Sequence, residues 1–362
     1  MSTPMNWKNI ITQQLNIEYP IIQAPMFGTA TPEMVTAATS IGCLGALPLG
    51  DLPAEKCIEI IRATRQLSNR PFAVNIFANE IPVITEDIRT KYTQTKQFIE
   101  DLARQHHLIV TLPTIDELPL NGYQEQVDAI VAEECKVVSF TFGNLDEQSI
   151  QKLKSNGTIL IGTCTSVKEA TILEQSGIDI LCVQGFEAGG HRGSFATADD
   201  NSPMIGGLAL LAQVHEAVSI PIIYAGGIYN AKTLLAANTL GAQGFQIGSL
   251  LLGSAESALK AFEKEKLRHV KEEEIVLTKS FSGRYARGIK NAFIEAVDHT
   301  DYILPFPFQS KLTVELRKAA KANNNIDFVS IWMGQSIHPF SGLSTAEILK
   351  ALIAATEKEY NR

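Results

Sequence analysis

The sequence predicts an α/β protein whose main part is a (β/α)8 TIM barrel, with a smaller subdomain inserted after the eighth strand–helix unit. Short apolar runs that end in Gly, Asn or Pro alternate with longer stretches of helical period along most of the chain. Several of these runs are apolar nearly throughout, which suits parallel strands that are covered on both faces. Eight such units over roughly 250 residues match the number of units in a (β/α)8 barrel.

The eight predicted strands account for the wall of this barrel. In chain order they are Tyr19–Met26, Cys43–Leu49, Phe72–Ala78, Val137–Gly143, Thr158–Cys164, Ile180–Phe186, Pro221–Gly227 and Gly244–Ser249. Helices are expected between them, for example over Pro53–Leu67, Ser166–Ser176 and Ala231–Leu240. A doubly wound sheet is the competing α/β architecture, but no GxGxxG motif follows the first strand. The barrel is therefore favoured.

Local signals mark where several helices begin. Thr31 is a cap residue, and Pro32 after it suits the first helical position. Ser166 and Glu169 have the spacing of a capping box, in which each side chain binds the other residue's backbone N–H. Gly177 follows the same predicted helix, where a left-handed terminal residue is favoured.

The alternation of strands and helices breaks down over residues 267–331. This stretch contains Pro305–Phe308 and only short strand-like and helix-like pieces. We expect residues 1–266 and 332–362 to form the barrel, and 267–331 to form a smaller α/β subdomain that covers the site. A final amphipathic helix, Thr345–Tyr360, is expected to pack on the barrel wall.

Composition excludes several classes of protein. With 362 residues, 45% of them hydrophobic and 19% charged, the chain can bury a large core and is neither disordered nor fibrous. A net charge of −8 argues against a nucleic-acid partner. No zinc-type Cys/His cluster is present, so no metal is expected. Five cysteines without a CxxC pair and no long apolar run over residues 1–8 predict a cytoplasmic protein. The lack of an apolar stretch of about 18 residues predicts that there is no membrane partner. We expect a monomer or a homodimer.

Glycines after the seventh and eighth strands suggest a phosphate site. Ligands of a (β/α)8 barrel bind at the carboxyl ends of the strands, and the last two loops commonly hold phosphate. Gly226 and Gly227 end the seventh strand, and Gly248 and Ser249 end the eighth. Bare backbone N–H groups before a helix can bind such an anion. The alternative is that the glycines only make tight turns.

His191 is the candidate for chemistry, because it follows Gly190 in the glycine-rich loop after the sixth strand. There its imidazole could lie over whatever the phosphate anchors. The alternative is a histidine with a structural role. Arg192 could neutralise an anion or be a solvated loop residue, and Glu187, the acid in this loop, could simply cap a helix.

At these residues the sequence resembles the nitronate monooxygenase family, formerly called 2-nitropropane dioxygenases, which are FMN-containing (β/α)8 barrels related to enoyl-ACP reductase II. The motifs that carry the resemblance, in the family's order, are Gln23–Met26, Pro71–Asn75, Ala188–His191, Ala225–Ile228 and Gln246–Ser249. Two later segments, Ser282–Arg287 and Ile331–Gln335, resemble the monooxygenases rather than the reductase.

The resemblance implies a bound FMN and a role for each matching position. The implied cofactor-binding residues are Ala24, Pro25, Met26, Asn75, Gln184, Gly189, Gly190, Gly226, Gly227, Gln246, Gly248 and Ser249. The first three would line the flavin ring, and the amides of Asn75 and Gln184 would bind its polar edge. The glycine pair before His191 would let the backbone approach the cofactor, and the later glycines with the serine would hold the phosphate. His191 would face the flavin across the substrate.

Two positions depart from the family pattern and are expected to face the substrate together with Lys311. Thr141 stands where the family has His, and Phe306 stands where it has Tyr before Pro. Both departures leave the substrate preference open.

The implied activity is FMN-dependent oxidative denitrification of alkyl nitronates, such as propionate 3-nitronate. O2 would convert them to an aldehyde or oxoacid plus nitrite by way of a flavin semiquinone. Two alternatives remain at this stage. One is an NAD(P)H-dependent flavin reductase acting on a quinone or an enoyl thioester, and the other is an FMN-free barrel that binds a phosphorylated ligand.

Overall fold

The computed structural model describes residues 5–195 and 203–362. Its centre is a closed barrel of eight parallel strands, in the order β1-β2-β3-β4-β5-β6-β8-β9, with β9 paired to β1. The strands are β1 Ile21–Gln23, β2 Leu44–Gly50, β3 Ala73–Phe77, β4 Val137–Thr141, β5 Ile159–Cys164, β6 Ile180–Gln184, β8 Ile222–Ala225 and β9 Gly244–Ile247. The predicted (β/α)8 barrel is confirmed.

Some predicted strands run past the end of the hydrogen-bonded ladder. Met26, Phe186 and Gly227 lie in loops or turns beyond the strands to which they were assigned, and Ser249 begins a short 3-10 helix, Ser249–Leu251. Apolar and small residues continue after these strands because the loops line the carboxyl-terminal mouth of the barrel. A sequence pattern alone therefore reads them as strand.

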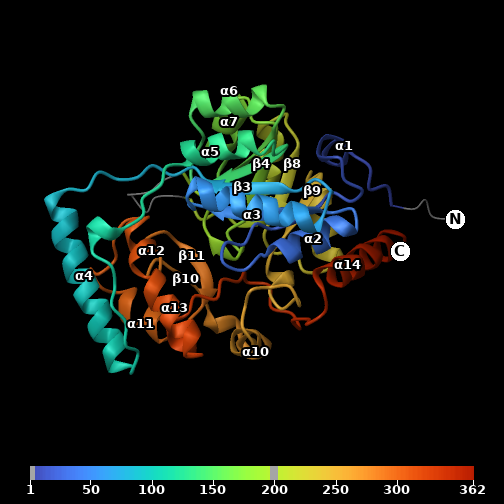
Figure 1. Ribbon diagram of the computed structural model, residues 1–362. Helices are drawn as coiled ribbons and strands as arrows, with labels where there is room; N and C mark the ends of the chain where they lie inside the picture. The colour runs from blue at the N-terminus through green and yellow to red at the C-terminus, as the bar shows by residue number, and fades with distance from the viewer. Residues whose placement is uncertain (1–4, 196–202) are drawn as a thin grey trace.

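Helices surround the barrel, as Figure 1 shows. They are α2 Pro32–Ser40, α3 Ala54–Leu67, α5 Tyr123–Ala132, α6 Glu147–Ser155, α7 Val167–Gln175, α8 Gly207–Ala217, α9 Ala231–Thr239 and α14 Thr345–Tyr360. The short α1, Ile10–Leu15, packs two apolar side chains with the core inside the barrel. The buried face of α14 joins the core between barrel and helices, and the helix lies against α9 and α2.

The predicted caps form, with one difference. The Thr31 hydroxyl accepts the N–H of Met34 at 3.2 Å, and the Ser166 hydroxyl accepts the N–H of Glu169 at 3.2 Å. The Glu169 carboxylate does not complete the predicted capping box. It binds the backbone N–H of Thr165 at 2.6 Å and that of Phe195 at 2.9 Å instead. It thereby ties the end of β5 to the loop after β6.

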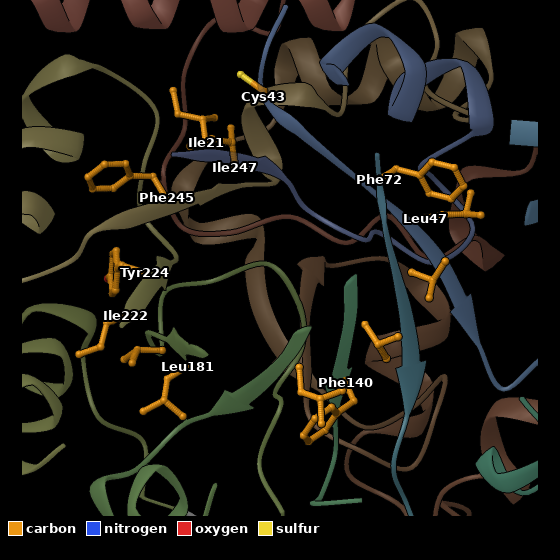
Figure 2. Packing of buried hydrophobic residues seen from close by; sticks show 14 of the residues in the cluster. Ile21, Cys43, Leu47, Phe72, Phe140, Leu181, Ile222, Tyr224, Phe245 and Ile247 are labelled. Atoms are coloured by element: carbon orange, nitrogen blue, oxygen red, sulfur yellow. The ribbon is translucent and has the colours of Figure 1, made fainter. Parts of the chain in front are cut away.

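Side chains on the barrel strands alternate between two cores. Ile21 belongs to the cluster between barrel and helices, whereas Ile22 belongs to the cluster inside the barrel. Figure 2 shows part of the outer cluster, where Phe140 and Phe245 are almost completely buried. Burial of one such side chain stabilises the fold by about 2–3 kcal/mol.

A second, antiparallel sheet lies at the mouth of the barrel. Its order is β10-β11-β7, with β10 Ile275–Thr278, β11 Ala286–Ile289 and β7 Gly190–His191. The short β7 comes from the loop after β6, and His191 pairs with Ala286. The candidate histidine is thus held by the sheet of the inserted segment, which the sequence did not predict.

A second hydrophobic core joins this sheet to helices from two distant parts of the chain. The helices are α4 Glu86–Gln105, α10 Ala261–His269, α11 Ala292–Val297, α12 Phe308–Leu312 and α13 Val314–Ala322. The rings of Phe98 in α4 and Tyr302 stack with centroids 4.3 Å apart, and Figure 1 shows α4 beside α11 and α12. The division into 1–266, 267–331 and 332–362 stays a prediction. Its first range includes residues 1–4 and 196–202, which lie outside the described residues.

Across residues 5–195 and 203–362, no helix combines the length and apolar character needed to cross a lipid bilayer.

Candidate active site

Four backbone N–H groups point to an anion site at the ends of β8 and β9. Gly226 and Gly227 follow β8 with φ values of +120° and +68°, a region that favours glycine. Gly248 and Ser249 follow the neighbouring strand β9. Among the described residues, none of these four N–H groups has a hydrogen-bond acceptor. Adjacent unpaired N–H groups without side-chain crowding suit a phosphate, so the expected glycine cradle is present.

The first loop of the barrel lies against this cradle. A side-chain Cβ placed on Gly248 would come within 3.6 Å of the Ala24 Cβ and 3.9 Å of the Met26 Sδ. Pro25 lies between those residues, and all three are half-buried. Gln246, also half-buried, lies on β9 just before the cradle. The structure therefore brings the predicted ring-lining loop and the predicted phosphate loop together.

Residues 333–336, which we call the strap, cross the mouth between three loops. The N–H of Gly334 donates to the Ser249 hydroxyl at 2.8 Å, and the Ser336 hydroxyl donates to the Gly227 carbonyl at 3.3 Å. A Cβ on Gly189 would lie 2.4 Å from the Gly334 backbone nitrogen. The strap thus occupies the space that Gly189 leaves. No strap residue was predicted to belong to the site, although Ile331–Gln335 is one of the segments that resemble the family.

Two charged residues of the His191 loop have structural partners. The Glu187 carboxylate accepts the N–H of Gly207 at 2.9 Å, at the start of α8, as its capping alternative predicted. It also accepts the Tyr224 hydroxyl, and burial together with Glu187 raises the pKa of that tyrosine. Arg192 is buried and donates to the Gln184 carbonyl at 2.6 Å and to that of Thr165 at 3.2 Å. It is thus no solvated loop residue, and these contacts hold the loop in place.

The two amide side chains expected at the flavin edge lie on β3 and β6. The Asn75 amide donates to the Ser139 hydroxyl at 2.9 Å and is buried. The Gln184 amide donates to the His191 carbonyl at 3.0 Å and accepts the N–H of Gly193 at 2.8 Å. Gln184 therefore fixes the backbone on which the candidate histidine sits.

His191 has a strongly lowered pKa. Its side chain is half-buried, and its Nε2 atom is fully buried without a hydrogen-bond partner among the described residues. Burial, and then the positive charges of Arg284 and Arg317, lower its pKa from 6.5 to about 3. Hence the imidazole is neutral at pH 7. An unpaired buried polar atom of this kind is costly, and it is typical of a site that a ligand completes.

Aromatic rings wall the space around His191. The centroid of its ring lies 5.5 Å from Trp332, 5.6 Å from Phe142 and 6.5 Å from Phe306. The wall continues outward through Phe77, 4.6 Å from Phe142, and Phe27, 5.7 Å from Phe77. Phe306 was expected to face the substrate. Phe77, Phe142 and Trp332 come from separate parts of the chain, and no local pattern marks them as neighbours.

Thr141, expected to face the substrate, lies at the end of β4 beside the His191 loop. A Cβ on Gly193 would come within 2.7 Å of its hydroxyl oxygen. Arg284 lies close to the next residue, Phe142: it is buried, with its guanidinium 4.4 Å from the ring centre of Phe142. It also donates to the Ser194 carbonyl, and burial lowers its pKa to about 10. A cation over an aromatic face is a stabilising contact, and this arginine was missed from the sequence.

Lys311, the third expected substrate residue, is already engaged. Its ammonium lies 2.7 Å from the carboxylate of Asp51, the residue that follows β2. Arg317, one helix further on, donates to the Ser310 carbonyl at 2.9 Å and the Thr313 carbonyl at 3.2 Å. The structure therefore gathers Phe306 and Thr141 around His191, and holds Lys311 against a carboxylate.

The chain is similar to known proteins over almost its whole length. A family model described as "Nitronate monooxygenase" matches residues 8–355. A "Probable nitronate monooxygenase" from Staphylococcus aureus (strain Newman) is 38% identical over 330 residues, which cover 91% of this chain and 92% of that protein. Among solved structures, a nitroalkane oxidase from Streptomyces ansochromogenes is 30% identical, with a TM-score of 0.87, over 97% of this chain and 98% of that chain.

A FabK structure from Thermotoga maritima has a TM-score of 0.75 at 24% identity over 98% of this chain and 97% of that chain, and this likeness concerns the fold alone. The family model and the relatives, by contrast, extend over almost the whole sequence. The chain belongs to the nitronate monooxygenase family and is an oxidoreductase.

Proposed function

We propose that this enzyme uses FMN and O2 to convert alkyl nitronates to an aldehyde or oxoacid plus nitrite. The observation that carries the proposal is His191. Its neutral imidazole has an unpaired buried nitrogen among the rings of Phe142, Phe306 and Trp332 and near Arg284 and Arg317, a group of side chains that we call the chamber. Such a chamber suits a small organic anion that needs one hydrogen-bond donor and little water.

The mouth offers a fit for FMN. The unpaired N–H groups of residues 226, 227, 248 and 249 would bind the phosphate oxygens. The Ala24–Met26 loop, which lies against Gly248, would lie along the ring system, with Gln246 nearby. Asn75 and Gln184 would present amide groups to its polar edge. When bound, FMN would supply an electron acceptor that takes electrons from the nitronate and passes them on to O2.

His191 would hold the nitronate rather than make it. A nitronate is already deprotonated, whereas a neutral nitroalkane must first lose a carbon-bound proton to a base. A base works best when its pKa is near the working pH, and the pKa of His191 is about 3. We therefore assign its Nε2 as a donor to a nitronate oxygen. Arg284 and Arg317, fixed by carbonyl groups, would supply a positive field for the anion.

The aromatic wall would keep water from the reacting carbon. Phe142 and Phe306 are both buried, and their centroids lie 5.4 Å apart on one side of His191. Trp332 lies near the histidine as well. Excluding water strengthens the hydrogen bond and the electrostatic attraction on which binding depends.

Anaerobic spectroscopy of the flavin-loaded enzyme tests the proposal. Mixing with propyl-1-nitronate should change the flavin's visible bands, and mixing with NADPH should not. In air, one nitrite should form for each propanal. Rapid bleaching by NADPH alone would favour the reductase of quinones or enoyl thioesters. A protein that takes up no FMN would favour the barrel that binds some other phosphorylated ligand.

We also propose a cytoplasmic location. The five cysteines are all free and buried. Burial raises the pKa of Cys43 to about 12 and that of Cys135 to about 11, so these thiols are unreactive. Free thiols of this kind fit a reducing compartment.

A further inference from the structure

The ion pair between Asp51 and Lys311 takes no part in the proposed mechanism. Its two charged groups are 2.7 Å apart, and the side chains are only 18% and 13% exposed. Asp51 directly follows β2, whereas Lys311 lies in α12, so the pair joins the barrel to the inserted segment. Ion pairs on open surfaces contribute little, but one this sheltered is screened less by solvent.

The pair lies at the outer end of the aromatic wall. Gly50, next to Asp51, is so close to Phe27 that a Cβ on it would come within 2.7 Å of that ring. Lys311 lies one helical turn beyond the Phe306–Pro307 peptide, and Phe306 closes the wall beside His191. Arg317 interacts electrostatically with both His191 and Asp51. A substrate whose nitronate group lies at His191 would therefore extend its other end toward this pair.

We propose that Asp51 is a specificity-determining residue. By pairing with Lys311, it makes the chamber accept nitronates with an uncharged alkyl tail and discriminate against nitronates whose tail ends in a carboxylate. This inference rests on the proposed function and refines it. Among the substrates considered, propionate 3-nitronate becomes a poor one, and propyl-1-nitronate a good one.

The physical reason is the charge at each end of the chamber. Arg284 and Arg317 act on His191 and attract the negative charge of the nitronate group. At the outer end the positive charge of Lys311 is already neutralised by Asp51. A tail carboxylate would have to displace Asp51 from the lysine and would then lie beside it, and like charges brought together in a sheltered site cost several kcal/mol. A methyl group in the same place meets only aromatic carbon and the lysine stem.

The test compares two substrates of equal length on the flavin-loaded enzyme, propyl-1-nitronate and propionate 3-nitronate, by nitrite release. Wild type should have the higher kcat/KM for propyl-1-nitronate. Asp51→Asn should raise the ratio of kcat/KM for propionate 3-nitronate over propyl-1-nitronate at least about tenfold, mainly through KM. Lys311→Met, which leaves Asp51 without its partner, should lower that ratio below the wild-type value.

Asp116→Asn is the matched control, because it removes the carboxylate of an ion pair with Arg89 that lies outside the site. Its ratio should equal that of wild type. A wild-type preference for propionate 3-nitronate, or an unchanged ratio in Asp51→Asn, would overturn the role of Asp51 while leaving the proposed function intact. If Asp51→Asn does not fold, a ratio that rises in Lys311→Met overturns it. Wild type that oxidises neither nitronate would overturn both proposals.

Discussion

Replacing His191 with Asn should make the stability of the protein less sensitive to acid. The folded protein keeps this imidazole neutral, with a pKa of about 3, whereas an unperturbed histidine has a pKa of 6.5. Between these values the unfolded chain binds one proton more than the folded protein. Each pH unit below 6.5 therefore lowers the free energy of unfolding by about 1.4 kcal/mol. Acidification from pH 7.5 to pH 5.0 should cost about 2 kcal/mol through this residue alone, and His191→Asn should abolish that share.

This effect can be measured by urea unfolding of protein freed of FMN, at both pH values, with tryptophan fluorescence as the signal. The difference in unfolding free energy between the two pH values should shrink by about 2 kcal/mol in His191→Asn. His107→Asn is the control, because His107 is exposed and its φ of +58° is one that Asn tolerates. Its pH dependence should match that of wild type. Equal losses in wild type and His191→Asn would refute the neutral imidazole and, with it, the argument for a pre-formed nitronate substrate.

Three further predictions concern the mouth of the barrel. His191→Asn should keep bound FMN but lower nitronate turnover, measured as nitrite release, by about a hundredfold, because a positioned hydrogen-bond donor is lost. Wild-type turnover would remove His191 from the mechanism. Gly226 has a φ of +120°, so Gly226→Ala should weaken FMN binding at least about tenfold in a flavin fluorescence titration. Gly157 also has a positive φ but lies far from the mouth, and Gly157→Ala should bind FMN normally. Gly189→Ala should push the strap aside and lower the free energy of unfolding, measured in urea, by about 1–3 kcal/mol. Gly206→Ala, whose Cβ would meet no atom within 4 Å, should lower it far less. Equal decreases in the two variants would mean that the strap does not need Gly189.

The barrel was predictable because its signals are local. An apolar run such as that over β6 encodes its own strand, and a cap such as Thr31 encodes the start of its own helix. The turns after β8 and β9 were predictable for the same reason. Glycine favours a positive φ, and Gly226 and Gly227 both adopt one. In a barrel of known strand order, local signals also predict which loops meet at the mouth.

The contacts that complete the site were not predictable, because they join residues far apart in the chain. The pairing of His191 with Ala286 and the hydrogen bond from Gly334 to Ser249 leave no periodic trace in the sequence. Nor does the sequence reveal that Lys311 meets Asp51, since either residue alone reads as a solvated charge. Resemblance to a family supplied candidates at these positions, but their partners came only from the three-dimensional structure.

The pairing of β7 with β11 also limits how this enzyme can be re-engineered. One strand of the small sheet belongs to a barrel loop, and the other two belong to the inserted segment. In a chimaera that exchanged the inserted segment alone, β7 would have to pair with an edge strand from another protein. Deleting the segment would leave β7 unpaired. Chimaeras should therefore exchange the β6–β7 loop together with residues 275–289. In this enzyme the unit of modular exchange is a sheet rather than a continuous stretch of chain.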